Sequence, residues 1–394
     1  MLQRAILFKE ISTTKNRCRT DLRRNGDAMK PVCCGFIGLG LIGGSIAKAL
    51  KEHHKEITLY AYDINPETLA LAKAEGIADE VSEQIGERFS ECDILFLCAP
   101  VSCNDDNLLR LKEFLSKDCI LTDVGSVKTG IHKQIAQAGL EHLFIGGHPM
   151  AGSERYGYAN SKAKLLENAY YILTPTPSVS AEKLSFYKEL VSSIGAIPLV
   201  LSYTEHDYVT AAVSHLPHVI AASLVNLVKD SDSAEGVMKM IAAGGFKDIT
   251  RIASSSSTMW QQICLTNTEN ISALLDTYIH MLQSVKEQID ARREREIFDF
   301  FNDARIYRDS FIEASSGPIK KEYAIWVDIA DEPGAIASIA TMLALNGISI
   351  KNIGITHNRE SEEGALRIEF YEEAGMLSAV TILTNRGYSI YGKK

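Results

Sequence analysis

The stretch VCCGFIGLGLIGGS, residues 32–45, decides the fold of the first part of the chain. The apolar run 32–37 is typical of a buried strand, and the pattern G-x-G-x-x-G follows it directly on Gly38, Gly40 and Gly43. The first glycine allows a tight turn, the second lets a pyrophosphate approach the backbone, and the third lets the next helix pack on the strand. The stretch therefore predicts a Rossmann-type dinucleotide-binding domain.

The cofactor predicted for this domain is NAD. A second strand, 57–62, ends in Asp63, where a carboxylate can bind the adenosine ribose and would repel the 2′-phosphate of NADP. No arginine follows in 64–66 to accept such a phosphate. Asp63 and two turns are expected to contact the cofactor. The first turn consists of Gly38, Leu39, Gly40, Leu41, Ile42 and Gly43, and the second of Ala99, Pro100 and Val101.

Alternating strand and helix patterns extend this domain over residues 31–203. Repeated alternation with short connections predicts a parallel, doubly wound sheet. The further strands are expected at 93–98, 119–124, 143–145, 170–175 and 197–201.

The stretch GGHPMAGSE, residues 146–154, is predicted to be a loop that follows the strand ending at Ile145. His148 would then lie beyond the C-terminal end of a strand, where open α/β sheets bind ligands. Ser126 follows the strand 119–124 and comes to the same edge of the sheet. A loop histidine with a structural hydrogen bond is the alternative, but the convergence with Ser126 favours a catalytic histidine.

Composition limits the function classes. The net charge of −9 gives no electrostatic footprint for nucleic acid or for an anionic membrane. No apolar run approaches the roughly 20 residues that span a bilayer. The eight cysteines show neither a CxxC pair nor metal-ligand spacing, so we expect no metal, no structural disulfide and a cytoplasmic protein.

Residues 1–30 differ from the rest of the chain, with eight Lys or Arg against three Asp or Glu. A transit peptide is one interpretation of such a basic start. Met29 lies immediately before the first strand, so a disordered extension or an upstream start-site artefact is favoured.

Helical periodicity dominates residues 204–312, beginning with Thr204 as N-cap, and predicts an α-helical, dimerising domain. The run 213–228 is apolar nearly all round, so this helix is expected to be buried, with a subunit interface as one option. Pro217 should kink the helix or begin a new one.

Two groups of polar residues in this domain are candidates for substrate binding. His215 and His218, beside Ser214, share one helix face, and hydrogen-bonded core histidines are the alternative. Asp248 and Arg251 lie one helical turn apart. They form either a solvated pair of small energy or an arginine grip on a carboxylate.

Residues 313–321 are predicted to be a linker, and 322–394 follow the order βαββαβ. That order is typical of a ferredoxin-like domain.

The chain resembles prephenate dehydrogenases, which have the same motifs in the same order: the glycine motif, Asp63, DVGSVK at 123–128, HPMAGSE at 148–154 and DITR at 248–251. The resemblance covers roughly residues 31–310. The tail resembles an ACT domain, whose signature is similar to DEPGAI at 331–336. The chain thus resembles the monofunctional, ACT-bearing type, which implies a homodimer that converts prephenate and NAD⁺ to 4-hydroxyphenylpyruvate, CO₂ and NADH.

The resemblance also implies roles for single residues. His148 would be the general base at the C4 hydroxyl of the substrate, and Ser126 would orient either that hydroxyl or the imidazole. Arg251 would hold a substrate carboxylate, and Trp260 would close the pocket. Further residues on the substrate side, including a gating ionic network with Arg251, would be Ser214, His218, Glu154 and Asp248. Tyrosine would be the feedback effector, bound near Asp331, Gly334, Ala335 and Ser349.

Three alternatives remain. Arogenate differs from prephenate only by an amino group in place of the side-chain ketone, so arogenate or cyclohexadienyl dehydrogenase activity is possible. A β-hydroxyacid dehydrogenase would need a helical K-x-x-N motif that is not evident here. A non-catalytic, NAD-sensing regulator would leave the combination of His148, Ser126 and Arg251 without a purpose.

Overall fold

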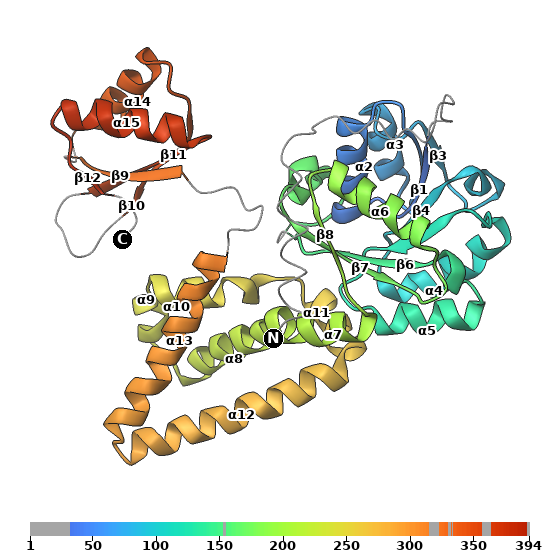
Figure 1. The fold of residues 1–394 in the computed structure, drawn as a ribbon. Helices are drawn as coiled ribbons and strands as arrows, with labels where there is room; N and C mark the ends of the chain where they lie inside the picture. Colours follow the sequence, from blue (N-terminus) through green and yellow to red (C-terminus); the bar gives the residue numbers. More distant parts are fainter. Residues whose placement is uncertain are drawn as a thin grey trace, which may run out of the picture. The chain divides into compact units, whose positions relative to one another are not determined.

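The computed structural model describes residues 32–152, 155–314, 323–329, 332, 334–356 and 364–391. The predicted extension 1–30 lies outside them. The chain divides into two compact units, Met1–Ile297 and Phe298–Lys394, whose elements are labelled in Figure 1.

The first unit contains the predicted parallel sheet, with strand order β3-β2-β1-β4-β5. Its strands are β1 (Cys33–Ile37), β2 (Thr58–Tyr62), β3 (Glu80–Ser82), β4 (Ile94–Leu97) and β5 (Ile120–Asp123), and its helices are α2 (Leu41–His53), α3 (Pro66–Ala74), α4 (Val101–Leu111) and α5 (Thr129–Ala138). Successive residues of a strand point to opposite faces. Phe36 and Phe96 accordingly belong to one apolar core, and Ile37 and Leu97 to another.

The glycine-rich turn has the geometry that its sequence predicts. Gly38 has φ +99°, and a Cβ there would lie 2.7 Å from the backbone N of Ala99. A Cβ on Gly43 would lie 2.7 Å from the carbonyl oxygen of Gly38. The turn between β1 and α2 is therefore packed directly against the end of β4, and only glycine fits at these two positions.

A smaller sheet of three strands corrects part of the prediction. It contains β6 (Ile145–Pro149), β7 (Tyr170–Pro175) and β8 (Ile197–Val200), with helix α6 (Ala181–Ser193) between the last two. One bridge between Leu121 and Phe144 places β6 parallel to β5, but β7 then runs antiparallel to β6. The expectation of a sheet that is parallel throughout is wrong beyond β6.

The helical part of this unit begins at α7 (Tyr203–Thr210) and not at the predicted cap Thr204. Ser202 is the N-cap, and its side chain accepts a hydrogen bond from the backbone N–H of Glu205. The later helices are α8 (Leu216–Ser231), α9 (Val237–Ile241), α10 (Gly244–Thr250), α11 (Ser257–Thr266) and α12 (Thr268–Asp290).

Helices α7 and α8 are joined by a π-helical turn, Ala211–His215, and Pro217 lies in the first turn of α8, in agreement with the prediction that it begins a new helical element. Proline cannot donate to the carbonyl four residues earlier. The wider turn just before Pro217 lets the helix continue.

The apolar run 213–228 has exposed side chains in the single chain, with Val213 of the π-helical turn 64% and Leu227 of α8 63% exposed. The continuous helix Tyr203–Ser231 is also long and apolar enough to cross a membrane, by length and composition alone. This differs from the expectation that no such segment exists, because a few polar residues interrupt the run without lowering its mean hydropathy enough. Core helices of soluble proteins pass the same test.

The second unit contains most of α13 (Glu294–Ala314), which takes up the first two residues of the predicted linker. It continues with β9 (Tyr323–Ile329), α14 (Ala335–Leu345), β10 (Ile350–Thr356), β11 (Gly364–Phe370), α15 (Glu373–Asn385) and β12 (Ile390–Tyr391). The strands form an antiparallel sheet of order β10-β11-β9-β12, and the predicted element order βαββαβ is present.

Candidate active site

His148 lies inside strand β6 and not in a loop beyond it, and it is only 8% exposed. The glycines before it serve close packing. A Cβ on Gly147 would lie 2.6 Å from the carbonyl oxygen of Asp123 in β5, and one on Gly146 would collide with Thr174 in β7. Their absence of side chains lets β6 fit between its neighbours, which fixes the histidine on a rigid strand.

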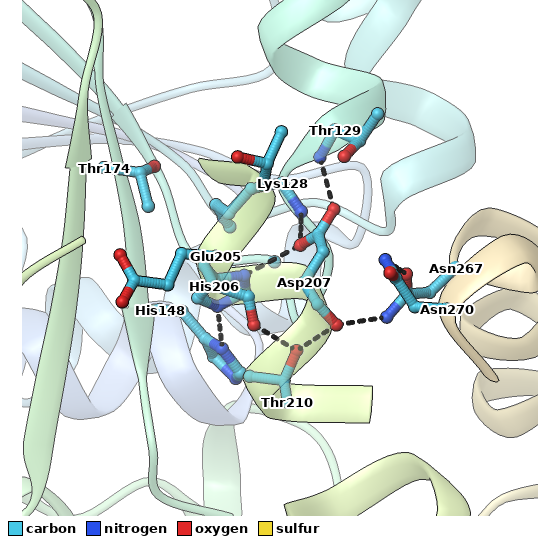
Figure 2. A network of polar contacts seen from close by, with 12 residues as sticks. Lys128, Thr129, His148, Thr174, Glu205, His206, Asp207, Thr210, Asn267 and Asn270 are labelled. Atoms are coloured by element: carbon cyan, nitrogen blue, oxygen red, sulfur yellow. Dashed lines mark hydrogen bonds and ion pairs between the residues drawn. The ribbon is translucent and has the colours of Figure 1, made fainter. Parts of the chain in front are cut away.

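A chain of three buried polar side chains begins at this histidine (Figure 2). Nδ1 of His148 lies 2.7 Å from Nε2 of His206, and Nδ1 of His206 lies 2.7 Å from Oδ1 of Asp207. Both partners belong to α7 and are fully buried. The histidine of the strand is thus held by a histidine and an aspartate of the first helix that follows the small sheet.

Asp207 also caps helix α5. Its carboxylate oxygens accept the backbone N–H groups of Lys128 at 2.7 Å and of Thr129 at 2.8 Å, as Figure 2 shows. The first N–H groups of a helix have no partner within the helix, and a negative charge is favourable there. One carboxylate therefore joins the start of α5, which follows Ser126, to the histidine pair.

A buried ion pair lies beside this chain. Nζ of Lys128 lies 2.5 Å from Oδ2 of Asp123 and donates to the carbonyl oxygen of Gly147 at 2.6 Å. Asp123 also accepts the backbone N–H of Gly147 at 3.2 Å. The side chains of Asp123 and Lys128 therefore bond both backbone groups of Gly147, which precedes His148, and so connect β5 to β6.

The electrostatics keep the histidines neutral. Burial, together with the nearby His206, Lys128 and His215, holds the pKa of His148 well below its ordinary value. Burial also lowers the pKa of His206, although the bond to Asp207 opposes this. Burial alone would raise the pKa of Asp207, but the hydrogen bonds from its neighbours outweigh burial and lower it.

Ser126 is half-buried in the turn between β5 and α5. Among the described residues, Nδ1 of the His148 ring bonds His206, and the orienting role of Ser126 stays a prediction.

Around the π-helical turn, the predicted histidines share one aromatic neighbour. The ring of His218 stacks on Trp260 with centroids 3.7 Å apart, and His215 meets the same indole edge-on at 6.0 Å. Nδ1 of His218 lies 2.9 Å from the carbonyl oxygen of Ser214. Nδ1 of His215 lies 3.2 Å from Nδ2 of Asn267, which supports the alternative of a hydrogen-bonded core histidine for this residue.

Arg251 begins the short 3-10 turn after α10 and is exposed, as is Asp248 on α10. Burial lowers the pKa of His218 and the charge of Arg251 lowers it further, so the two side chains belong to one neighbourhood. Glu154 lies outside the described residues, and the predicted ionic network is therefore only partly described.

The predicted cofactor residues come together at the start of α2. Gly40 is the N-cap of α2 and has no side-chain cap, and a Cβ built there would meet nothing within 4 Å. Oδ2 of Asp63 accepts the backbone N–H of Leu39 at 2.7 Å, which fixes the end of β2 against the turn. An open helix N-terminus beside a glycine turn is suited to a pyrophosphate.

The predicted effector residues lie in the second unit. Gly334 has φ +95° and precedes α14, which begins at Ala335, while Ser349 is exposed just before β10. Asp331 lies outside the described residues.

The sequence patterns do not predict His206, Asp207 and Lys128 as members of this site. The stretch 204–207 predicts only the start of a helix. Ser202 and Glu205 form the capping pattern S-x-x-E, which would have set the helix start correctly. His206 and Thr210 then fall on one face four residues apart, a polar pair on a buried face.

Comparison with known proteins gives two family matches. Residues 46–199 match the family described as "Prephenate dehydrogenase, nucleotide-binding domain". Residues 202–303 match "Prephenate dehydrogenase, dimerization domain". The boundary between the two matches falls at the start of α7, next to His206 and Asp207.

Individual relatives agree with these matches. Prephenate dehydrogenase of Bacillus subtilis is 37% identical over 341 residues, which is 85% of this chain and 91% of that protein. The crystal structure of Aquifex aeolicus prephenate dehydrogenase with hydroxyphenyl propionate and NAD⁺ is 34% identical, with a TM-score of 0.68 over 72% of this chain and all of that one. Synechocystis arogenate dehydrogenase is 27% identical, with a TM-score of 0.65 over 71% of this chain and all of that one. The chain belongs to the prephenate dehydrogenase family.

Proposed function

We propose that this chain catalyses the NAD-dependent oxidative decarboxylation of prephenate to 4-hydroxyphenylpyruvate. Beyond family membership, the observation that carries the proposal is His148, a neutral imidazole held on a rigid strand with one ring nitrogen fixed by His206. In this proposal the other ring nitrogen, Nε2, faces the substrate.

NAD fits the residues at the start of α2. The open N-terminus of this 13-residue helix and the turn at Gly38 and Gly40 would hold the pyrophosphate, and Asp63 would bind the adenosine ribose. When bound, NAD supplies the acceptor for the hydride that leaves C4 of the substrate. The carboxylate of Asp63 would disfavour a 2′-phosphate and so favours NAD over NADP.

His148 acts as the general base. Its Nε2 accepts the proton of the C4 hydroxyl while the hydride leaves the same carbon, and loss of CO₂ then makes the ring aromatic. A general base of this kind typically contributes about 10²–10⁴-fold to the rate. The lowered pKa keeps the imidazole unprotonated at neutral pH, so the base is ready before substrate binds.

The substrate would be held on the side of the π-helical turn. Arg251 grips a carboxylate, and Ser214, His218 and Trp260 line the same side. The stacking of His218 on Trp260 and the nearby charge of Arg251 support this grouping. Glu154 and Asp248 complete a gating network with Arg251, and Ser126 orients the substrate hydroxyl.

The active form is a homodimer in the cytoplasm. The exposed apolar side chains of α8 support this, because a second copy of the chain would cover them. Helix α8 also lies within residues 202–303, which match a dimerization domain.

The second unit is an ACT domain that binds tyrosine as a feedback inhibitor. Its sheet order supports this, as does the tight turn at Gly334 before α14. Asp331, Ala335 and Ser349 would line the effector site. Coupling between effector and substrate sites is typically worth about 1–3 kcal/mol.

Arogenate is the second candidate substrate, because the Synechocystis arogenate dehydrogenase has the same fold over most of the chain. The test is to follow absorbance at 340 nm with NAD⁺ and each substrate in turn. NADH formation with prephenate supports the proposal. Formation with arogenate alone would transfer the proposal to that substrate, and none with either would refute it.

The role of His148 is tested by His148→Asn, which keeps much of the size and polarity and removes the base. NAD binding should persist while turnover falls by about 10²–10⁴-fold. Near-normal turnover would refute the assignment.

A further inference from the structure

We propose that His206 and Asp207 are positioning residues that hold His148 in the tautomer with its proton on Nδ1 and a bare lone pair on Nε2. The inference rests on the proposed function, in which Nε2 of His148 is the general base. It assigns to two residues of α7 a task that they perform through His148.

The side chain of Asp207 is fully buried, and its hydrogen bonds favour the ionised form. A carboxylate can only accept hydrogen bonds. Its two oxygens already accept the backbone N–H groups of Lys128 and Thr129, and Oδ1 also faces Nδ1 of His206 at 2.7 Å. Nδ1 of His206 must therefore carry a proton and donate it to Asp207.

The tautomer of His206 then determines that of His148. A neutral imidazole with a proton on Nδ1 has an acceptor at Nε2. Nε2 of His206 lies 2.7 Å from Nδ1 of His148, so Nδ1 of His148 has to donate. The only proton of the neutral His148 ring is thereby placed on Nδ1, and Nε2 is left with a free lone pair.

The proton balance of the reaction follows from this arrangement. The proton of the substrate hydroxyl moves to Nε2 of His148, while the proton on Nδ1 stays on that ring. The imidazolium that forms donates to the neutral His206, whose far side is bonded to Asp207. The aspartate of serine-protease triads fixes its histidine in a comparable way, and losing the correct tautomer there costs about 10⁴-fold in kcat.

The far end of the chain is anchored, as Figure 2 shows. The backbone carbonyl of Asp207 accepts the Nδ2 group of Asn267 at 2.8 Å, and Oγ1 of Thr210 donates to the carbonyl of His206 at 2.9 Å. Asn270 in turn donates to Oδ1 of Asn267 at 2.8 Å. The backbone of His206 and Asp207 is therefore anchored by Thr210 and Asn267, while the imidazole itself bonds Asp207 and His148.

The key variant is His206→Asn, compared with His132→Asn as a matched control. An asparagine at 206 can still donate to Asp207, but it leaves no acceptor near Nδ1 of His148. His132 is also a buried histidine, 6% exposed, and its Nε2 bonds Oγ1 of Thr174, outside this chain of side chains. Both variants remove one buried imidazole, so a general packing effect would appear in both.

The tautomer is measured by long-range ¹H–¹⁵N spectra of histidine-labelled full-length protein near neutral pH. The signals of His148 are assigned by their loss in His148→Asn. We expect a protonated Nδ1 and a bare Nε2 in the wild type and in His132→Asn, and protonation moving to Nε2 in His206→Asn. In the prephenate assay, kcat of His206→Asn should fall by about 10²–10⁴-fold, with KM changed by less than about threefold.

A protonated Nε2 of His148 in the wild type would overturn the proposal. So would an unchanged tautomer in His206→Asn, or an equal loss of kcat in His132→Asn. If His206→Asn does not fold, His206→Gln replaces it, because the amide oxygen of Gln can accept from Nδ1 of His148. That variant should keep the wild-type tautomer. Normal turnover of His148→Asn would refute the base assignment instead, while the spectra report the tautomer without any turnover.

Discussion

Replacing Gly147 by alanine tests whether the glycines before His148 serve close packing. The added Cβ would lie 2.6 Å from the carbonyl oxygen of Asp123 and 3.0 Å from Cε1 of Tyr171. The first neighbour is backbone and cannot rotate away, so β5 and β6 have to move apart. Overpacking of this kind typically costs about 1–3 kcal/mol. We expect the upper end of that range, because the carbonyl of Gly147 also accepts the bond from buried Lys128.

The free energy of unfolding is measured by urea titration, with circular dichroism as the signal, and Gly130→Ala is the control. Gly130 lies in helix α5, and a Cβ there would meet nothing within 4 Å. Alanine is favoured over glycine inside a helix by roughly 0.5–1 kcal/mol, so the control should be stabilised. A Gly147→Ala protein as stable as the wild type would refute the packing argument and restore the interpretation of this stretch as an open turn.

Three further predictions concern single side chains. Burial lowers the pKa of His132 to about 4 from an ordinary value of 6.5, so the unfolded state takes up this proton first as the pH falls. The free energy of unfolding should therefore be unaffected by His132 above pH 6.5 and should decrease toward pH 4 by up to roughly 3 kcal/mol. Urea titrations of His132→Gln should show a weaker dependence of this free energy on pH. Lys128→Met leaves the carboxylate of Asp123 buried without its cation and should cost about 3–5 kcal/mol in the same titration, whereas adding Asp123→Asn should restore part of the loss. Arg251→Ala should mainly raise KM for prephenate in the 340 nm assay, and a loss confined to kcat would contradict its role as a carboxylate grip.

The part of the fold that the sequence predicts correctly depends on local patterns. The run 32–45 specifies strand, turn and helix through neighbouring residues alone, and the same holds for the order βαββαβ in the tail. The direction of β7 relative to β6 depends on partners far away in sequence. An apolar run does not show whether its strand will pair in parallel or antiparallel. The two glycines at 146–147 are typical of a turn. In the structure they lie inside β6, where a side chain would collide with β5 or β7.

The candidate site divides in the same way. His148 stands out because its flanking residues resemble a family motif. His206 and Asp207 do not, since their task becomes visible only when α7 is packed against β6 and the start of α5. The apolar run 213–228 predicts a buried helix, with a subunit interface as one option. In the described part of the single chain Val213 and Leu227 are exposed, and hydrophobicity carries no information about which molecule provides the contact.

The π-helical turn Ala211–His215 has a consequence for how the family can change through insertions and deletions. A π turn holds one residue more than an α-helical turn, so deleting one residue there would restore regular α geometry. Because the π turn already takes up its extra residue, this deletion would leave the downstream helix close to its present orientation. A one-residue deletion in the regular part of α7 beyond His206 would instead rotate everything downstream by about 100° around the helix axis, the angle that one residue contributes. His206 would then keep its place, but His218 and the apolar face of α8 would point elsewhere. The π turn is therefore the segment between the histidine pair and α8 that can lose one residue without turning these two regions relative to one another.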